Sequence, residues 1–348
     1  MRTDQEPRTD QEPSTDLDPS TDRDPRTARD PARGIFSLEG RRAPGLYLVA
    51  WLLVIAGGAL LVVAALTPSD VGRAVLAVVG GVALGVGFAA GAGSQIVERR
   101  DRPPDRYRGP SPALAFLAVL AAASLFSGLI VGTGIMDPLA PAGFLATLVA
   151  VAAIYMGAVW LFAVRSGALG WEDMGWPVRR PGWLRQVTRD AGAAIGVMLP
   201  TTLGVLVLGG IVGTLLGVEA PDVLPTPTTS LDALLVAIGA AVVAPVGEEL
   251  FFRGFALTAW LRDLGPRPAV IRSALFFALV HIANITTSTF SEGAAQAALQ
   301  TAVIVPVGLV LGWLFLRHGM VGAIGGHVTY NTSLLLLLLL SSVLPRPA

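Results

Sequence analysis

The sequence contains no cysteine and no lysine, and it has few charged residues of any kind. Without cysteine the chain can form no disulfide, iron–sulfur site or thiol nucleophile. Charged residues make up 14% of the 348 residues, where a soluble domain carries about 25%. The formal net charge is +0, which gives no basis for binding nucleic acid. Because 53% of the residues are hydrophobic and mean hydropathy is +0.64, the composition predicts a polytopic membrane protein.

Nine apolar runs follow one another along the chain, each close to the ~20 residues that a helix needs to cross a bilayer. They lie at about 45–66, 71–96, 113–136, 141–164, 191–217, 231–257, 268–286, 296–316 and 320–343. The 268–286 run is the weakest because it carries Arg272, His281 and Asn284. The sequence therefore predicts an all-α, polytopic transmembrane helical bundle of about nine (eight to nine) spans.

The arginines alternate between the connections of these runs. They cluster before the first run and after the second, fourth, sixth and eighth, whereas the alternate connections are nearly free of them. Cytoplasmic loops carry the excess of positive charge, so we expect a cytoplasmic N-terminus and an outside C-terminus in a cell (plasma) membrane. Because arginine is the only strongly basic residue type, we expect a high-GC genome and hence a bacterial source.

Composition also divides the chain. Residues 2–31 are five hexads, each ending in an acid and proline, with no hydrophobic face, so we expect residues 1–42 to form a disordered cytoplasmic tail. Residues 43–164 hold the N-terminal transmembrane helices. Residues 165–190 form a cytoplasmic connection, in which two Gly-Trp steps indicate an amphipathic element at the membrane interface. Residues 191–348 form a transmembrane core that carries the polar motifs.

Two adjacent carboxylates and an arginine lie inside this apolar core. Charge within a membrane helix is expensive and usually functional. Glu249 and Arg253 are four residues apart and share a helix face, which predicts a structural ion pair. Glu248 points about 100° away from Glu249 and stays free for chemistry.

Two of the three histidines also lie in apolar runs. His281 ends the segment Phe277-Ala-Leu-Val-His281, and we expect Phe277 to pack against it. His327 and Asn331 are again four residues apart on one face. The helical rise places both histidines at a depth similar to that of the carboxylates. The third, His318, lies in a predicted short turn and is interpreted as solvated.

Such a group of residues suits hydrolysis. Glu248 can take a proton from water, while His281 positions that water or shares the proton. His327 and Asn331 can donate hydrogen bonds to a developing oxyanion, each worth ~3 kcal/mol. In a second assignment, Glu248, His281 and His327 bind one divalent metal such as zinc, which activates the water. The residues leave both assignments open.

The three motifs together resemble those of a known family. Glu248-Glu249-xxx-Arg253, Phe277-xxx-His281 and His327-xxx-Asn331 match, in order, the motifs of the CPBP family of CAAX-type prenyl endopeptidases and their bacterial relatives. The resemblance covers about residues 231–343. The bacterial relatives include bacteriocin-processing and self-immunity proteins.

The resemblance implies an integral-membrane protease with an all-helical core. It implies that Glu248 and His281 activate water, that His327 and Asn331 stabilise the oxyanion, and that Glu249, Arg253 and Phe277 support them. The implied substrate is a membrane-associated or prenylated peptide or protein. The family is often labelled metalloprotease, so either one zinc ion or none is implied. The alternative is a non-catalytic membrane protein, such as a scaffold or a bacteriocin self-immunity protein.

Overall fold

The computed structural model of the chain describes residues 37–177, 181–219, 224–282, 285, 287 and 289–343. The hexads of the predicted tail lie outside these residues, as does Asn284. Within the described ranges every regular element is a helix, so the predicted all-α class is confirmed. All the helices belong to the compact unit Arg41–Ala348.

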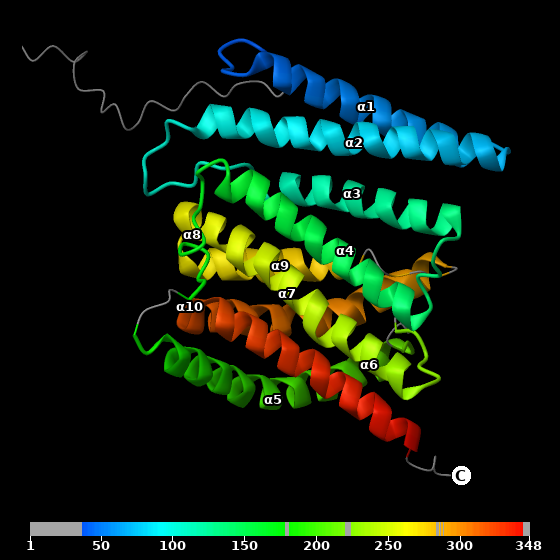
Figure 1. Ribbon diagram of the computed structural model, residues 1–348, viewed down its shortest axis with the longest axis vertical. Coiled ribbons are helices and arrows are strands. Elements are labelled where there is room, and N and C mark those ends of the chain that lie inside the picture. Colours follow the sequence, from blue (N-terminus) through cyan, green and yellow to red (C-terminus); the bar gives the residue numbers. More distant parts are fainter. Residues whose placement is uncertain are drawn as a thin grey trace, which may run out of the picture. The chain divides into compact units, whose positions relative to one another are not determined.

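Four long helices form the first half of this unit and pack in chain order (Figure 1). Proline occupies the first turn of three of them, where its missing N–H is harmless and its fixed φ suits a helix. The closest pair meets through glycines, since a Cβ on Gly80 would lie 3.0 Å from the Gly57 carbonyl oxygen. The elements are α1 (Pro44–Leu66), α2 (Asp70–Arg99), α3 (Pro112–Thr133) and α4 (Pro141–Val159), which the π-helical turn η1 (Trp160–Val164) extends.

The second half contains the polar motifs. Its α6 begins with a capping box between Thr229 and Asp232, and the helical path then continues without a break to Leu264. The elements are α5 (Trp183–Leu216), α6 (Ser230–Ile238), η2 (Gly239–Val243), α7 (Ala244–Glu249), η3 (Leu250–Leu257), α8 (Thr258–Leu264), α9 (Pro266–Ile282) and α10 (Phe290–Val343).

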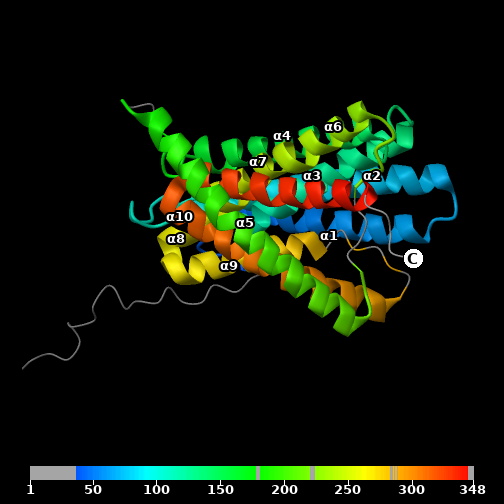
Figure 2. The same cartoon turned by 90° about the horizontal axis from the view of Figure 1, so that it is seen from below.

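The element α10 is two helices joined by a reversal at Gly319. The backbone there has φ 61° and ψ −155°, a region that essentially only glycine occupies. Gly326 packs against Leu311 and Leu314, so the halves before and after Gly319 lie antiparallel. Figure 2 shows both halves leaving the turn at the same end of the bundle. The predicted separation of the 296–316 and 320–343 runs is thus present in the fold.

Seven helical stretches of the described residues are long and apolar enough to cross a membrane. One of them contains both halves of α10, and α9, which has 17 residues, corresponds to the weakest predicted run. Each of the nine predicted runs therefore coincides with a helix or with one half of α10. These helices make the chain an integral membrane protein.

The connection after η1 consists of turns and irregular segments. Residues 165–167 and 171–175 form turns, and Gly167 and Gly175 have positive φ, which breaks any helical path. Met174 is fully buried, and the Gly175 carbonyl accepts a hydrogen bond from the Met320 amide at 2.9 Å. Asp173 pairs with Arg262 at 2.9 Å. The segment therefore covers the Gly319 reversal and fastens it to α8.

His318 is not the solvated residue that the sequence indicates. Its Nδ1 lies 3.0 Å from Oδ1 of Asp190 on α5, and the Asp190 side chain is only 6% exposed. Gln186 donates to the other oxygen of Asp190 at 2.8 Å. The difference arises because the reversal at Gly319 folds His318 back onto α5, a contact between residues 128 positions apart.

An aromatic cluster holds η3 at the centre of the unit. Phe251 and Phe252 are fully buried, and each makes ring contacts with Phe116 of α3 and Tyr155 of α4. Phe252 also contacts Phe277 of α9 at a centroid separation of 5.1 Å. Rings tilted edge to face stabilise such a core beyond the area that they bury. The cluster therefore fixes the helix that carries Glu248 against the helix that carries His281.

The Gly319 reversal generates a prediction about stability. We expect Gly319→Ala to lower the midpoint of thermal unfolding of the detergent-purified protein by the equivalent of about 1–3 kcal/mol. A Cβ there would adopt a strained φ and approach the Gly175 carbonyl oxygen to 2.7 Å. Gly204→Ala is the matched control, because that glycine is exposed on α5 with no atom within 4 Å of the added carbon. Equal midpoints for the two variants would contradict the role given to Gly319.

Candidate active site

Glu248 and Glu249 lie in a short α-helical turn between two π-helical segments. Pro245, at the start of α7, has no N–H to donate, and the amide of Ala244 bonds to Gly239 instead of Ala240. The Ala240 carbonyl is thereby freed from the helix, and the Asn331 side chain donates to it at 2.8 Å. Widened turns of this kind occur often at functional sites. The widened turn thus ties the Glu248 helix to the second half of α10.

Glu249 and Arg253 form the ion pair that their spacing predicts. Arg253 Nη1 donates to Glu249 Oε1 at 2.8 Å, and both side chains are 0% exposed. The guanidinium also donates to the Gly308 carbonyl at 3.3 Å and lies 4.3 Å from the Phe277 ring centroid. A buried charge is tolerable when such partners surround it. The pair therefore joins η3 to α9 and to the first half of α10.

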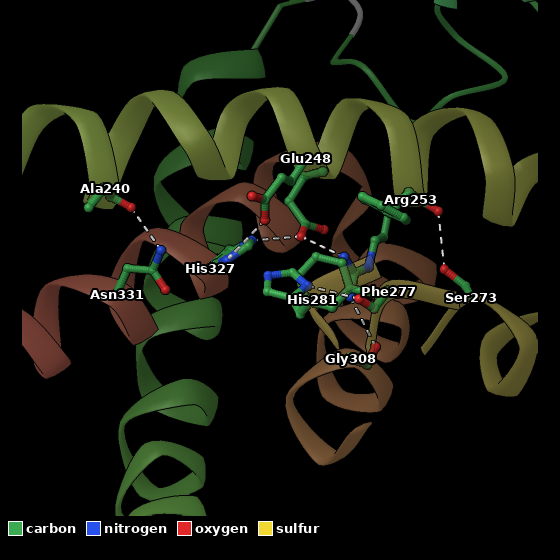
Figure 3. A network of polar contacts seen from close by, with 11 residues as sticks. Ala240, Glu248, Arg253, Ser273, Phe277, His281, Gly308, His327 and Asn331 are labelled. Atoms are coloured by element: carbon green, nitrogen blue, oxygen red, sulfur yellow. Dashed lines mark hydrogen bonds and ion pairs between the residues drawn. The ribbon is translucent and has the colours of Figure 1, made fainter. Parts of the chain in front are cut away.

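His327 extends this network to the other half of α10. Its Nδ1 lies 2.8 Å from Glu249 Oε1, the same oxygen that accepts from Arg253 (Figure 3). Because a carboxylate paired with arginine only accepts, the proton of this contact lies on Nδ1. The contact fixes the ring and leaves Nε2 directed toward Glu248, whose Oε2 lies 3.8 Å away.

Glu248 differs from its neighbour in both partners and exposure. Its side chain is 22% exposed, and the structure gives it no arginine partner in the described part of the chain. The 3.8 Å separation from His327 Nε2 is too long for a direct hydrogen bond, and a shared water would suit it. Glu249 is thus held in a buried pair, while Glu248 remains accessible.

His281 comes to the same place from α9. Its Nδ1 donates to the Phe277 carbonyl oxygen at 2.8 Å, which leaves Nε2 as an acceptor. The Phe277 ring packs between the two histidines, with centroid separations of 4.5 Å to His281 and 5.7 Å to His327. Phe277 therefore orients both rings, and the polar neighbours come from three separate helices.

These side chains line one cavity of about 870 Å³. Glu248, His281, His327 and Asn331 are all at its wall, together with the Phe277 ring. Apolar residues of α5 and of both halves of α10 form much of the remaining wall. The structure thus brings the four expected catalytic residues to one hollow, whereas Glu249 and Arg253 lie behind it.

Sequence reasoning missed the backbone partners of this site. The carbonyls of Ala240 and Gly308 hold Asn331 and Arg253, and neither residue type attracts notice in a sequence. For Ala240 the sequence contains a signal, because Pro245 lies five residues later. In a π-helical turn the N–H of that residue would donate to the Ala240 carbonyl, and proline has no N–H. For Gly308 no signal exists, because the contact depends on tertiary packing.

A metal ion in the cavity would need ligand atoms from Glu248, His281 and His327. Among the described residues, no group of three or more histidine, aspartate or glutamate side chains has the geometry to hold one. The Nδ1 contacts of His327 with Glu249 and of His281 with a carbonyl leave Nε2 as the free nitrogen of each ring, so the misfit lies in the relative positions of the side chains. As they stand, Glu248, His281 and His327 do not fit a three-ligand zinc site.

The buried pair generates a prediction. We expect Arg253→Leu to lower the unfolding midpoint by the equivalent of about 3–5 kcal/mol, because it leaves the Glu249 charge buried without its partner. The double variant Glu249→Leu/Arg253→Leu removes both charges and should lose less than the sum of the single variants. Thermal unfolding in detergent measures all three.

The exposed pair of Arg73 and Asp70 provides the control, since Arg73→Leu should change stability by only about 0–1 kcal/mol. Additive losses in the double variant would show that the two charges do not stabilise each other.

Comparison with known proteins identifies a family that matches the segment carrying these residues. Residues 230–333 match the family described as Type II CAAX prenyl endopeptidase Rce1-like. No curated protein and no solved structure matches the chain. The matched region begins at the first residue of α6 and ends two residues after Asn331, so it contains all three motifs. The family model for an Rce1-like type II CAAX prenyl endopeptidase domain therefore matches residues 230–333, in agreement with the family that the three motifs predict.

Proposed function

We propose that the chain is a membrane-embedded endopeptidase that uses Glu248 to activate water. One observation carries the proposal. Of the two adjacent carboxylates, Glu249 is neutralised by Arg253 at 2.8 Å, while Glu248 faces a cavity shared with His281, His327 and Asn331. An accessible carboxylate beside two histidines in an apolar protein is an arrangement suited to general base catalysis.

The first step places water between Glu248 and His281. The free Nε2 of His281 accepts one hydrogen of this water, and the Glu248 carboxylate takes the other as a proton. The oxygen then adds to the carbonyl carbon of the substrate's peptide bond. His281 holds the water in one orientation, so that its oxygen points at the carbonyl carbon. This lowers the entropic part of the activation barrier.

The second step breaks the peptide bond. Addition of water turns the carbonyl oxygen into an oxyanion, which takes a hydrogen bond from an N–H of Asn331 and, in the doubly protonated form of the ring, a second one from His327 Nε2. Asn331 has two amide hydrogens, and the Ala240 carbonyl takes only one of them. When the tetrahedral species collapses, the C–N bond breaks and Glu248 gives its proton to the leaving amine. The products are a carboxylic acid and an amine, and Glu248 is again a carboxylate.

The cavity wall favours a substrate with an apolar part. Leu334, Leu335 and Leu338 of α10 line the cavity together with Val205 and Leu206 of α5, and a hydrocarbon lining of this kind suits an apolar group. A prenylated or otherwise membrane-associated peptide would bury its apolar portion here while its peptide bond reaches Glu248. The proposal retains a cytoplasmic N-terminus and a bacterial plasma membrane.

A cleavage assay tests the assignment of Glu248. The probe is a quenched fluorescent peptide that ends in a farnesylated cysteine and three further residues. We expect Glu248→Gln to lower kcat by about 10²–10⁴-fold, because the general base is lost, while the unfolding midpoint stays that of the wild type. Glu292→Gln is the control, since Glu292 is an exposed carboxylate in the first turn of α10 and does not line the cavity.

Full cleavage activity in Glu248→Gln would contradict the assignment of Glu248 as the general base. A cellular phenotype that survives Glu248→Gln but is lost when the whole protein is deleted would favour the alternative function, a non-catalytic scaffold or self-immunity protein.

Elemental analysis decides between the two ways of activating water. We expect less than stoichiometric zinc in the purified protein and unchanged cleavage of the farnesylated probe after chelation, because the described donors do not form a three-ligand site. About one zinc per chain that is lost in Glu248→Ala and His281→Ala, together with cleavage that requires it, would instead make these residues metal ligands.

A further inference from the structure

Gln300 is a polar side chain of the cavity that the proposed reaction does not use. It stands in the first half of α10, between Leu299 and the apolar stretch that includes Val303 and Val307. It lines the same cavity as Glu248 and His327. Its Oε1 is buried and has no hydrogen-bond partner among the described residues.

An unpartnered amide oxygen in such surroundings is unfavourable. A buried polar atom that lacks a partner loses its hydration without gaining a hydrogen bond, so native structures contain few of them. A hydrocarbon chain entering the cavity would leave this oxygen just as unsatisfied. A peptide N–H in the cavity would satisfy it once the Gln300 side chain turns its amide toward the cavity, and the amide group can also donate to a peptide carbonyl. The chemistry of Gln300 therefore matches a peptide backbone.

We infer that Gln300 binds the backbone of the substrate peptide at a distance from the scissile bond. The inference rests on the proposed function, since it assigns a further contact to the same substrate. Gln300 lies eight residues before Gly308, the partner of Arg253, which is ~12 Å along the helix axis. An extended peptide covers that length with about three or four residues. Gln300 thus fixes the register of the peptide in the cavity.

Gln296 provides a matched control on the same helix. It lies one turn earlier on the same face as Gln300, and its Oε1 is likewise buried without a partner in the described part of the chain. It does not line the cavity. Replacing either glutamine by leucine removes one unpartnered amide oxygen from the same helix. The two variants differ in that only Gln300 lines the cavity.

Steady-state kinetics with the farnesylated probe provide the first test. We expect Gln300→Leu to raise KM about three- to tenfold, the effect of one hydrogen bond, with kcat within about twofold of the wild type. Gln296→Leu should leave both constants within about twofold. Dissociation constants of the probe, measured by fluorescence anisotropy in a Glu248→Gln background, should rise by the same factor for Gln300→Leu.

Ester substitution in the probe separates a direct contact from a structural effect. Probes in which single amide N–H groups are replaced by an ester oxygen lose one donor each. We expect one position at which the ester weakens binding to the Gln300 protein about three- to tenfold but does not weaken binding to Gln300→Leu. A structural role for Gln300 would give equal losses in both proteins at every position, which would overturn the inference.

The remaining outcomes distinguish this inference from the proposed function. Cleavage by wild type and Gln300→Leu with equal KM overturns the inference and leaves the protease assignment standing. Binding without cleavage, weakened by Gln300→Leu, supports the peptide contact and overturns the protease assignment. A probe that is neither bound nor cleaved overturns both.

Discussion

The buried contact of Glu249 with Arg253 and His327 is the constraint on which the rest of the site depends. One carboxylate oxygen accepts from both Arg253 and His327 at 2.8 Å, and none of the three side chains is more than 5% exposed. A charge in such an environment depends on these contacts, because burial has removed its hydration. The three residues come from η3 and its preceding turn and from the second half of α10, so the network requires those helices to meet. The contact between these helices also fixes the position of Glu248, the residue that precedes Glu249 in the chain.

Two local features make that meeting possible. The reversal at Gly319 brings the second half of α10 back along the first, so that Gly308 and His327 approach the same ion pair from opposite halves. The π-helical turns around α7 free the Ala240 carbonyl, which Asn331 then uses. Each feature depends on a residue whose backbone is special: glycine tolerates the positive φ, and Pro245 lacks an N–H.

The division between two adjacent glutamates shows how one carboxylate of a membrane protein can stay accessible beside a buried one. Successive residues on a helix point about 100° apart, so one can lie in the packed interior while the next faces a cavity. Glu249 is held in the buried ion pair, and Glu248 remains accessible from the cavity. The apolar wall around Glu248 lowers the local dielectric constant, which strengthens polar interactions inside the cavity. Gln300 is part of the same wall, and its amide oxygen is buried without a partner among the described residues.

The sequence by itself determined the helical class, the nine apolar runs and the i, i+4 pair of Glu249 with Arg253, because hydrophobic length and helical period are local properties. It also placed Glu248, His281, His327 and Asn331 in order within three motifs. Only the tertiary structure decided that these residues share a cavity, that His318 contacts Asp190, and that residues 165–175 cover the Gly319 reversal. It also showed that carbonyls of Ala240 and Gly308 hold two motif side chains. Backbone carbonyls are the same in every residue, so a sequence does not reveal which of them will be left free for a side chain far along the chain.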